Sequence, residues 1–268
     1  MTFFRSILVI SCLFLCAGPS RAASVEGIVR AVHEVELAFQ LDGVVAKLLV
    51  KEGSRVRQGD ALIRLDDTLQ KLEVDRREAI FNDRAEIDSN RKNLEITKGL
   101  LDSARELYRK MSAVSRDEVM NLEMQYHSLA GKIEVAEAHK KQEQIELAIA
   151  KEMLSRYALP SPVTGTVTLI RREPGEWAKS GETIMAVVDT SVCHVDFNVE
   201  ERHARTLRVN RLVTIRVREG DSLVQKRARI IYVAPVADKA SALVRIRVEF
   251  ENEDARVIPG VLAYMDVR

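Results

Sequence analysis

Few residues in this sequence have the types and spacing that active-site chemistry requires. The histidines are far apart in the chain: His33, His127, His139, His194 and His203. Cys193, His194 and His203 offer three side chains that bind zinc, but no fourth ligand follows at a spacing typical of a zinc site. The sequence also has no phosphate-binding glycine loop and no arrangement of serine, histidine and aspartate typical of a hydrolase. We therefore expect no catalytic residue, no cofactor and no metal, and a protein that is not an enzyme and works by assembly.

Composition indicates a chain that folds around a hydrophobic core. The sequence has 268 residues, of which 46% are hydrophobic and 30% charged, which excludes a disordered or collagen-like chain. Lysine and arginine total 41 against 40 aspartates and glutamates, so no basic excess points to nucleic-acid binding. No apolar run reaches about 18 residues, the length of an ordinary bilayer-spanning helix.

The first 22 residues are typical of an export signal. Arg5 precedes an apolar run over residues 7–17, and a Gly-Pro pair and small residues follow up to Ala22. We expect cleavage after Ala22, which leaves Cys193 as the only cysteine and excludes an internal disulfide. Lipidation at Cys12 is the alternative, but the apolar run continues beyond this residue.

Two glycine-containing segments repeat each other at an offset of 122 residues. Their matching positions are Gly43, Gly53, Gly59 and Asp67 in the first segment and Gly165, Gly175, Gly181 and Asp189 in the second. We interpret the six glycines as structural turns, with positive φ at the second and third glycine of each segment. The apolar side chains of the first small sheet are expected to be Val44, Leu48, Val50, Leu62 and Leu65. Because each half is too short to bury a core alone, we expect residues 36–67 and 158–190 to pack face to face.

Residues 68–157 separate these halves and are predicted to form an α-helical hairpin. The stretch has no proline and is rich in residues that favour helix. One apolar seam repeats every seven residues, at Ile80, Ile87, Leu94, Leu101 and Tyr108. A second seam contains Val119, Leu122, Tyr126, Leu129, Ile133 and Ala136, then Leu147, Ala150, Leu154 and Tyr157. Ser115 followed by Glu118 is a capping-box pattern, so we place one helix over 68–111 and the next over 115–157.

From residue 191 onward, short alternating strands are expected. They are residues 195–199, 212–217, 228–233, 243–250 and 263–267, a pattern typical of a small antiparallel barrel. A short helix over 200–209 is expected to end at Asn210 in a left-handed conformation. The early strand, residues 23–35, is expected to join this barrel of residues 191–268.

The predicted fold class is therefore mainly β with a long α-helical hairpin: a split lipoyl-like (barrel-sandwich hybrid) domain, an antiparallel coiled-coil hairpin and a small β-barrel domain. The informative segments are Leu41-Asp42-Gly43-Val44-Val45, Val50-Lys51-Glu52-Gly53, Leu159-Pro160-Ser161-Pro162-Val163-Thr164-Gly165 and Ile258-Pro259-Gly260-Val261. In these segments and their order, the sequence resembles the HlyD-type periplasmic adaptor family, also called membrane fusion proteins, which includes adaptor subunits of RND-type efflux pumps. Because the sequence stops at Arg268, the resemblance is to a short form without the membrane-proximal domain.

This resemblance implies a periplasmic adaptor subunit of a tripartite efflux or secretion system, which serves the transmembrane transport of small molecules. Such adaptors are exported in Gram-negative bacteria and associate with the inner membrane. They form homo-oligomers, usually hexamers, that join an inner-membrane transporter of RND or ABC type to a TolC-type outer-membrane channel.

The resemblance also places partner-binding residues at the hairpin tip: Arg105, Leu107, Tyr108 and Ser115. Well-known members carry an Arg, a Leu four residues later and a Ser seven residues after that. Matching Ser115 to this Ser puts Tyr108 and Ala104 at the other two positions, so the register departs by one residue from Leu107 and Arg105. Ser115 is equally consistent with a plain helix cap.

Three other interpretations differ in testable ways. A lipoyl or biotinyl carrier would present a lysine on the turn between the halves, where this chain has the helical insertion that begins at Asp66-Asp67-Thr68. A coiled-coil spacer of the cell envelope would not need the paired lipoyl-like halves. A type I secretion adaptor would have an ABC exporter as its transporter.

Overall fold

The computed structural model describes residues 23–111 and 113–267, so the predicted export signal lies outside the described residues. The described chain forms two compact units, one of residues 33–189 and the other of residues 23–32 with 190–267. Among the described residues, no helix combines the length and the hydropathy needed to cross a bilayer.

The first unit contains a small β-sandwich. Its complete strands are β2 (Gly43–Leu48), β3 (Arg55–Val56), β4 (Ala61–Leu65), β5 (Ala158–Pro160), β6 (Gly165–Ile170) and β7 (Trp177–Ala178). One layer has the order β5-β4-β2-β7, and the other contains β3, β6 and the first part of β8 (Thr183–Glu200). The core between the layers includes Leu62, Ile63, Leu65, Val167 and Ile184, each at most 1% exposed.

The two halves of the repeat interlock through equivalent hydrogen bonds. The Gly53 amide donates to the carbonyl of Val167 at 2.8 Å, and the Gly175 amide donates to the carbonyl of Val45, also at 2.8 Å. Gly175 and Val167 lie 122 residues after Gly53 and Val45, so each bond is the equivalent of the other in the repeat. The two halves are therefore related by an approximate two-fold symmetry. The prediction that the halves stack face to face was wrong, because each layer takes strands from both halves.

Four of the six repeat glycines have the predicted turn conformation. Their φ angles are 83° at Gly53, 89° at Gly59, 93° at Gly175 and 76° at Gly181. Positive φ was not predicted for Gly43 and Gly165, but the prediction that they form turns was wrong, since they begin strands β2 and β6. These two positions need a small residue because other chain segments lie close to them.

The first strand of the repeat also faces the core differently from the prediction. Val45 is 1% exposed and contacts the sandwich core, whereas Val44 is 38% exposed and pairs with Trp177 of β7. The pairing of β2 with β4 shifts register between Val45 and Lys47. Because a shift of one residue reverses the face on which a side chain lies, the alternation read from the sequence does not continue through this point.

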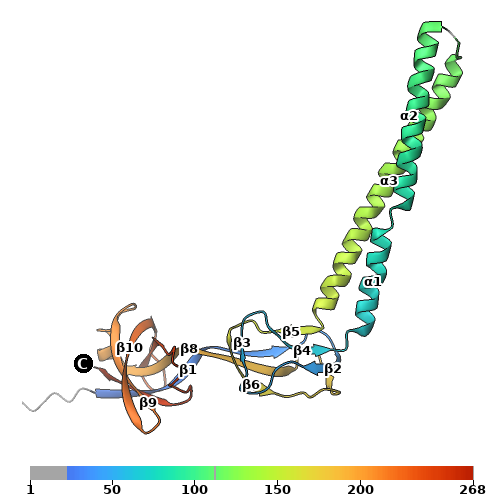
Figure 1. The fold of residues 1–268 in the computed structure, drawn as a ribbon. Helices are drawn as coiled ribbons and strands as arrows, with labels where there is room; N and C mark the ends of the chain where they lie inside the picture. Colours follow the sequence, from blue (N-terminus) through green and yellow to red (C-terminus); the bar gives the residue numbers. More distant parts are fainter. Residues whose placement is uncertain (1–22, 112, 268) are drawn as a thin grey trace, which may run out of the picture. The chain divides into compact units, whose positions relative to one another are not determined.

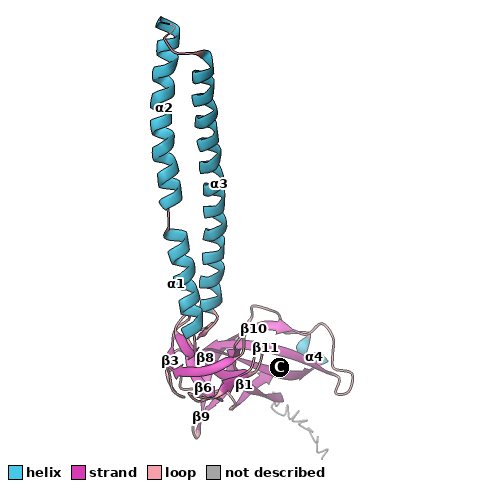
Figure 2. Cartoon of the chain, turned by 90° about the vertical axis from the view of Figure 1, so that its right-hand side faces the viewer, coloured by secondary structure: helices cyan, strands magenta, loops and turns pink. Residues whose placement is uncertain are grey.

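The helical insertion is a hairpin whose first limb is divided. This limb consists of α1 (Thr68–Asn82) and α2 (Ala85–Met111), and the return limb is α3 (Arg116–Ser155) (Figures 1 and 2). The prediction of one helix over 68–111 was therefore wrong at Asp83, whose ψ of 117° is extended. The Asp83 carboxylate accepts a hydrogen bond from the Ala85 amide at 3.0 Å. Such a local bond to the backbone favours a new helix start over continuation of the old helix.

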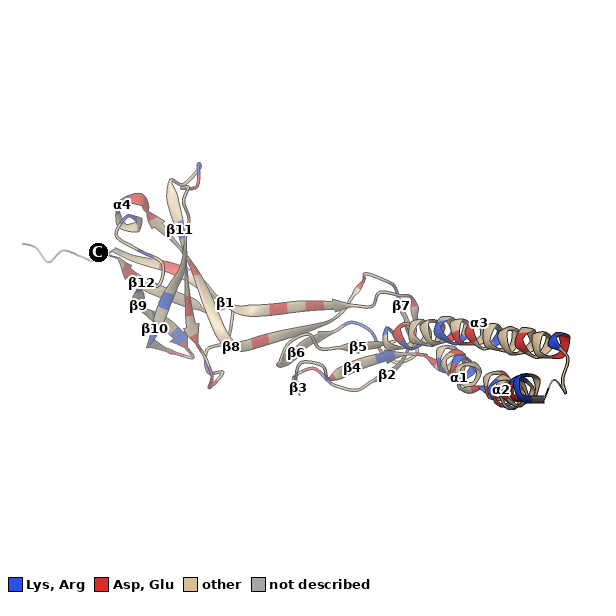
Figure 3. Cartoon of the chain, turned by 90° about the horizontal axis from the view of Figure 1, so that it is seen from above, with Lys and Arg blue, Asp and Glu red and all other residues tan. Residues whose placement is uncertain are grey.

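The predicted seams lie on the packed side of the helices over most of their length. Ile87, Leu101, Ile133, Ala136, Leu147 and Ala150 are buried. The first seam is shorter than predicted at both ends, since Ile80 is 41% and Tyr108 is 43% exposed. Charged residues of both signs alternate along the outer faces (Figure 3), which keeps these faces in water.

The second unit is a small antiparallel barrel. Its strands are the first part of β1 (Ala23–Ala38), the last part of β8, β9 (Leu212–Glu219), β10 (Ser222–Val233), β11 (Leu243–Glu251) and β12 (Leu262–Val267). They follow the order β1-β12-β9-β10-β11-β8, and a pairing of β1 with β8 closes the barrel. Asn210 has the predicted left-handed conformation, at φ 70°, but the helix before it, α4 (Glu201–Ala204), is shorter than the predicted 200–209.

Candidate functional site

The tip of the hairpin is formed by the last turns of α2 and the first turns of α3. Ser115 caps α3, and its hydroxyl accepts a hydrogen bond from the Glu118 amide at 3.2 Å. Arg105 is held across the hairpin by an ion pair with Glu123 at 2.6 Å. Leu107 is 41% exposed, and Tyr108 is also exposed. The structure therefore brings the four predicted tip residues to one end of the hairpin and gives two of them structural partners.

The departure in register at the tip has a structural counterpart. Ala104, which the predicted match places at the Arg position, is 7% exposed and so lies on the packed side of α2. Arg105, one residue later, has a side chain that is 45% exposed despite its ion pair. Contact with another molecule is therefore open to Arg105 and not to Ala104.

Sequence reasoning missed two residues near the tip. Met120 is 50% and Met124 is 64% exposed, and they lie four residues apart on α3. Met124 lines a shallow groove with Asn121, Gln125, Ser128, Leu129 and Lys132. The available signal was a pair of methionines at helical spacing outside the predicted seam, and flexible thioether side chains suit an adaptable contact surface.

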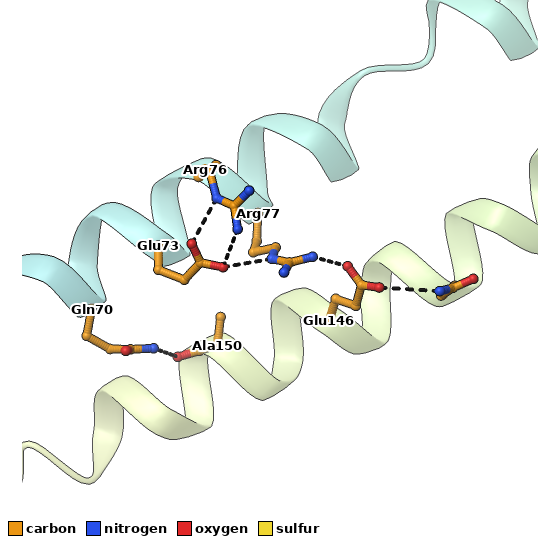
Figure 4. A network of polar contacts seen from close by, with 7 residues as sticks. Gln70, Glu73, Arg76, Arg77, Glu146 and Ala150 are labelled. Atoms are coloured by element: carbon orange, nitrogen blue, oxygen red, sulfur yellow. Dashed lines mark hydrogen bonds and ion pairs between the residues drawn. The ribbon is translucent and has the colours of Figure 1, made fainter.

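A charged network ties the base of the hairpin together (Figure 4). Glu73 accepts hydrogen bonds from Arg76 and Arg77 on its own helix, and Arg77 also pairs with Glu146 of α3. Gln70 adds a bond between α1 and α3, from its side-chain amide to the Ala150 carbonyl at 3.3 Å. The network fixes α1 against α3 below the break in the first limb.

The break itself is supported by a lysine from the return limb. The ammonium group of Lys140 donates to the carbonyls of Ile80 and Phe81 at 2.9 and 3.2 Å, and it pairs with Glu143 at 2.6 Å. The last carbonyls of a helix have no partner within the helix, and a cation there is favoured by the helix dipole. Lys140 thus caps α1 where the first limb changes helix.

We predict that the charge of Glu73 stabilises the hairpin base in a pH-dependent way. Hydrogen bonds from Arg76 and then Arg77 lower the pKa of Glu73 from its ordinary 4.5 to about 2. Because the pKa is lowered in the folded state, the stabilisation is present above about pH 4.5 and is lost as the pH falls toward 2.

Urea unfolding, monitored by the circular dichroism of the helices, measures the free energy of unfolding at several pH values between 2 and 4.5. In the variant Glu73→Gln, this free energy should depend less on pH than in the wild type. Glu95→Gln is the matched control, since Glu95 is exposed and has no ion pair among the described residues. An unchanged pH profile for Glu73→Gln would contradict the assignment.

The residues considered as metal ligands do not form a site. No group of three or more ligand-type side chains lies together among the described residues. Cys193 is fully buried in the barrel core and not in an accessible cluster. Burial and the nearby Arg247 lower the pKa of His194, and Asp196 beside it is bound by Arg247 at 2.7 Å. Cys193 therefore belongs to the barrel's core, and His194 lies beside the ion pair of Arg247 with Asp196.

Comparison with protein families decides what this arrangement is. The model for the barrel-sandwich hybrid domain of RND membrane fusion proteins matches residues 33–190, and that for the CusB-like β-barrel domain matches residues 194–268. The chain belongs to the RND membrane fusion protein family. In this membrane fusion protein, the sandwich and hairpin fall in the first matched range, and the barrel apart from strand β1 falls largely in the second.

Curated relatives are similar to this membrane fusion protein along most of its length. One is an uncharacterised protein of Haemophilus influenzae, 24% identical over 90% of this chain and 56% of its own length. Another is the antibiotic efflux pump periplasmic linker protein ArpA of Pseudomonas putida, 23% identical over 87% of this chain and 59% of its own length. The chain thus spans somewhat more than half the length of these relatives.

Solved structures of membrane fusion proteins share the fold. MacA from Actinobacillus actinomycetemcomitans has a TM-score of 0.67 at 23% identity, covering 92% of this chain and 78% of MacA. A MacA–MexA chimera that carries the α-hairpin domain of Pseudomonas aeruginosa MexA has a TM-score of 0.60 at 20% identity, covering 91% of this chain and 80% of the chimera. At these identities the likeness concerns the fold alone.

Proposed function

We propose that this membrane fusion protein is a periplasmic adaptor subunit of a tripartite efflux system. It links an inner-membrane transporter to an outer-membrane channel through an oligomeric funnel. The observation that carries the proposal is a helical hairpin inserted between the interlocked halves of a sandwich, in a chain matched by RND membrane fusion protein models. Relatives named as efflux pump periplasmic linkers support it.

Each part of the chain has its own role in this proposal. Residues 1–22 direct export to the periplasm of a Gram-negative bacterium and are removed there. The halves 36–67 and 158–190 build a ring of copies, six in the simplest assembly, and the barrel of residues 191–268 with the strand 23–35 lies toward the inner membrane. Residues 68–157 act as an antiparallel rod of two limbs, and the 40 residues of α3 give it a length of about 60 Å.

The family match and the hairpin tip also indicate which transporter and which channel this protein would bind. The RND description of the matched models favours an RND transporter over an ABC exporter. A channel of the TolC type would meet Arg105, Leu107, Tyr108 and Ser115 at the hairpin tip. The chemistry of the tip suits this role because exposed apolar side chains there lie beside charged and polar groups that are already held in place.

We predict that Ser115 can be changed in two ways that separate docking from capping. Ser115→Asp keeps a good N-cap and adds a charge to the proposed contact, so export in a complemented deletion strain should fall at least tenfold with normal protein levels. Ser115→Ala removes the cap at a cost of about 1 kcal/mol of helix stability but adds no charge, so export should stay near wild type. Normal export by Ser115→Asp would contradict tip docking.

Crosslinking tests the same contact directly. A photoreactive amino acid at Leu107 should capture an outer-membrane channel in cells, whereas the same probe at Leu72, an exposed leucine near the hairpin base, should not. Light scattering of the purified protein should give the mass of a closed ring. A persistent monomer without a channel crosslink would favour the envelope-spacer interpretation instead.

A further inference from the structure

One end of the barrel combines apolar and cationic side chains that are both turned to solvent. This is the end where β8 stops at Glu200 and α4 follows. We call the surface formed by Arg208, Val209, Arg211, Leu212 and Val236 the barrel-end surface. Val209, Leu212 and Val236 are 51%, 60% and 70% exposed, which is unusual for three aliphatic side chains at one end of a small barrel.

The arginines here fall into two groups. In the run from 202 to 211 an arginine recurs every third residue. Arg202 pairs with Glu200 at 2.7 Å and Arg205 pairs with Glu201 at 2.6 Å, so their charges are balanced locally. The second group is Arg208 and Arg211.

Arg208 and Arg211 keep an unbalanced charge. Arg208 donates to the carbonyls of Arg205 and Leu207, and Arg211 donates to the carbonyl of Thr206 at 3.1 Å. Within the described part of the chain, neither has a carboxylate at ion-pair distance. A guanidinium held by carbonyls has a fixed position and N–H groups left to offer, which suits recognition of phosphate oxygens.

The apolar and cationic groups share the same depressions. Arg208 and Val236 line one with Leu207, Pro235 and the ion pair of Arg205 with Glu201. Arg211 and Leu212 line another, which also includes Val267 and the ion pair of Arg216 with Asp266. Aliphatic side chains beside arginines are the combination that binds the boundary between lipid headgroups and acyl chains.

The path of the chain points to the same occupant. Ala23, the first residue of β1, pairs with Val267, so the chain enters the barrel beside Leu212. The apolar run of residues 7–17 ends only five residues before Ala23. The barrel end at Ala23 is therefore the part of the barrel that follows most closely in the sequence after an apolar export segment.

We propose that the barrel-end surface binds the anionic phospholipid surface of the inner membrane. Arg208 and Arg211 contact lipid phosphates, while Val209, Leu212 and Val236 enter the headgroup region. This inference does not depend on docking of the hairpin tip to a channel, because it concerns lipid and a different unit of the chain.

Vesicle flotation of the protein purified from the periplasmic fraction tests the proposal, with mass spectrometry to identify its N-terminus. The protein should bind vesicles of phosphatidylcholine and phosphatidylglycerol in equal parts more tightly than vesicles of phosphatidylcholine alone, and salt should weaken the binding. The double variant Arg208→Gln with Arg211→Gln should bind the anionic vesicles roughly 30-fold more weakly, from about 1 kcal/mol per arginine near such a surface.

Two further variants keep the test decisive. Arg218→Gln with Arg256→Gln removes the same charge from exposed residues toward the other end of the barrel and should leave binding within about twofold of wild type. Val236→Gln replaces no arginine and should weaken binding roughly fivefold without loss of folding, because Val236 is 70% exposed. Equal binding to both kinds of vesicle, or equal losses in the two double variants, would overturn the proposal and leave an acidic protein surface as the partner of this end.

Discussion

Replacement of Gly165 by alanine should destabilise the sandwich by about 3 kcal/mol, one of the largest effects expected of a single methyl group in this protein. A Cβ at Gly165 would lie 2.4 Å from the carbonyl oxygen and 2.8 Å from the carbonyl carbon of Val188. Both atoms belong to the backbone of β8, which pairs with β6 in the sheet, so no side-chain rotation relieves the clash. The strands must separate, and the hydrogen bonds that join them must lengthen.

The repeat provides a matched control for this prediction. Gly43 occupies the equivalent position in the first half, but a Cβ there would meet the side chain of Leu65, at 3.1 Å for the nearest atom. A leucine side chain can move by a few tenths of an ångström, and alanine also lowers the entropy of the unfolded chain. Gly43→Ala should therefore change stability by less than about 1 kcal/mol.

Urea unfolding monitored by tryptophan fluorescence measures the stability of the sandwich in both variants. Trp177 is the only tryptophan in the sequence and lies in β7 of the sandwich. The unfolding midpoint of Gly165→Ala should fall well below that of Gly43→Ala. Similar midpoints would show that the close approach of β8 to Gly165 does not constrain the folded sandwich.

Local signals in the sequence predicted much of this fold. The positive φ at Gly53 and Gly175 and the cap at Ser115 depend on a few neighbouring residues, and the structure confirms all three. The break at Asp83 also depends on neighbouring residues, because the Ala85 amide donates to the Asp83 carboxylate. The seven-residue spacing of the seam continues through this point, so it predicted an unbroken helix. An aspartate that follows an asparagine within a helix deserves to be weighed as a new helix start.

Pairings between distant segments could not be predicted in the same way. The 122-residue offset indicated two equivalent halves, but not that Gly53 bonds to Val167 while Gly175 bonds to Val45. Which strands pair depends on the whole sheet, and no short stretch of sequence encodes it.

The candidate sites show the same limit. The arginines at 202, 205, 208 and 211 are visible in the sequence, but the partners of their side chains are not. Only the structure separates Arg202 and Arg205, which have carboxylate partners, from Arg208 and Arg211, which donate to backbone carbonyls. At the tip, likewise, the pair between Arg105 and Glu123 requires the register of α2 against α3. Local sequence gives the residues at a site, and the tertiary fold decides which of them are free to bind.

Replacement of Asn252 by alanine should destabilise the barrel by about 3 kcal/mol, because it leaves several buried groups without a partner. Asn252 is 1% exposed. Its side-chain amide donates to the carbonyls of Thr190 and Val257 at 2.9 and 3.0 Å, and its side-chain oxygen accepts from the Val257 amide at 3.1 Å. The side chain thus holds the loop after β11 against the strand segment at Thr190. Alanine removes all three bonds and leaves a space that is costly to fill with water.

Asn198→Ala is the control for this change, since Asn198 lies on β8 of the same barrel with its side chain exposed. It should alter stability by no more than about 0.5 kcal/mol. Thermal unfolding compares the two variants, and hydrogen exchange of the Val257 amide locates the effect, because this amide loses its acceptor only in Asn252→Ala. Protection of Val257 that persists in Asn252→Ala, with an unchanged melting temperature, would mean that water replaces the asparagine at little cost and that the loop is held by its backbone bonds, such as that from the Asn252 amide to the Ser191 carbonyl at 2.7 Å.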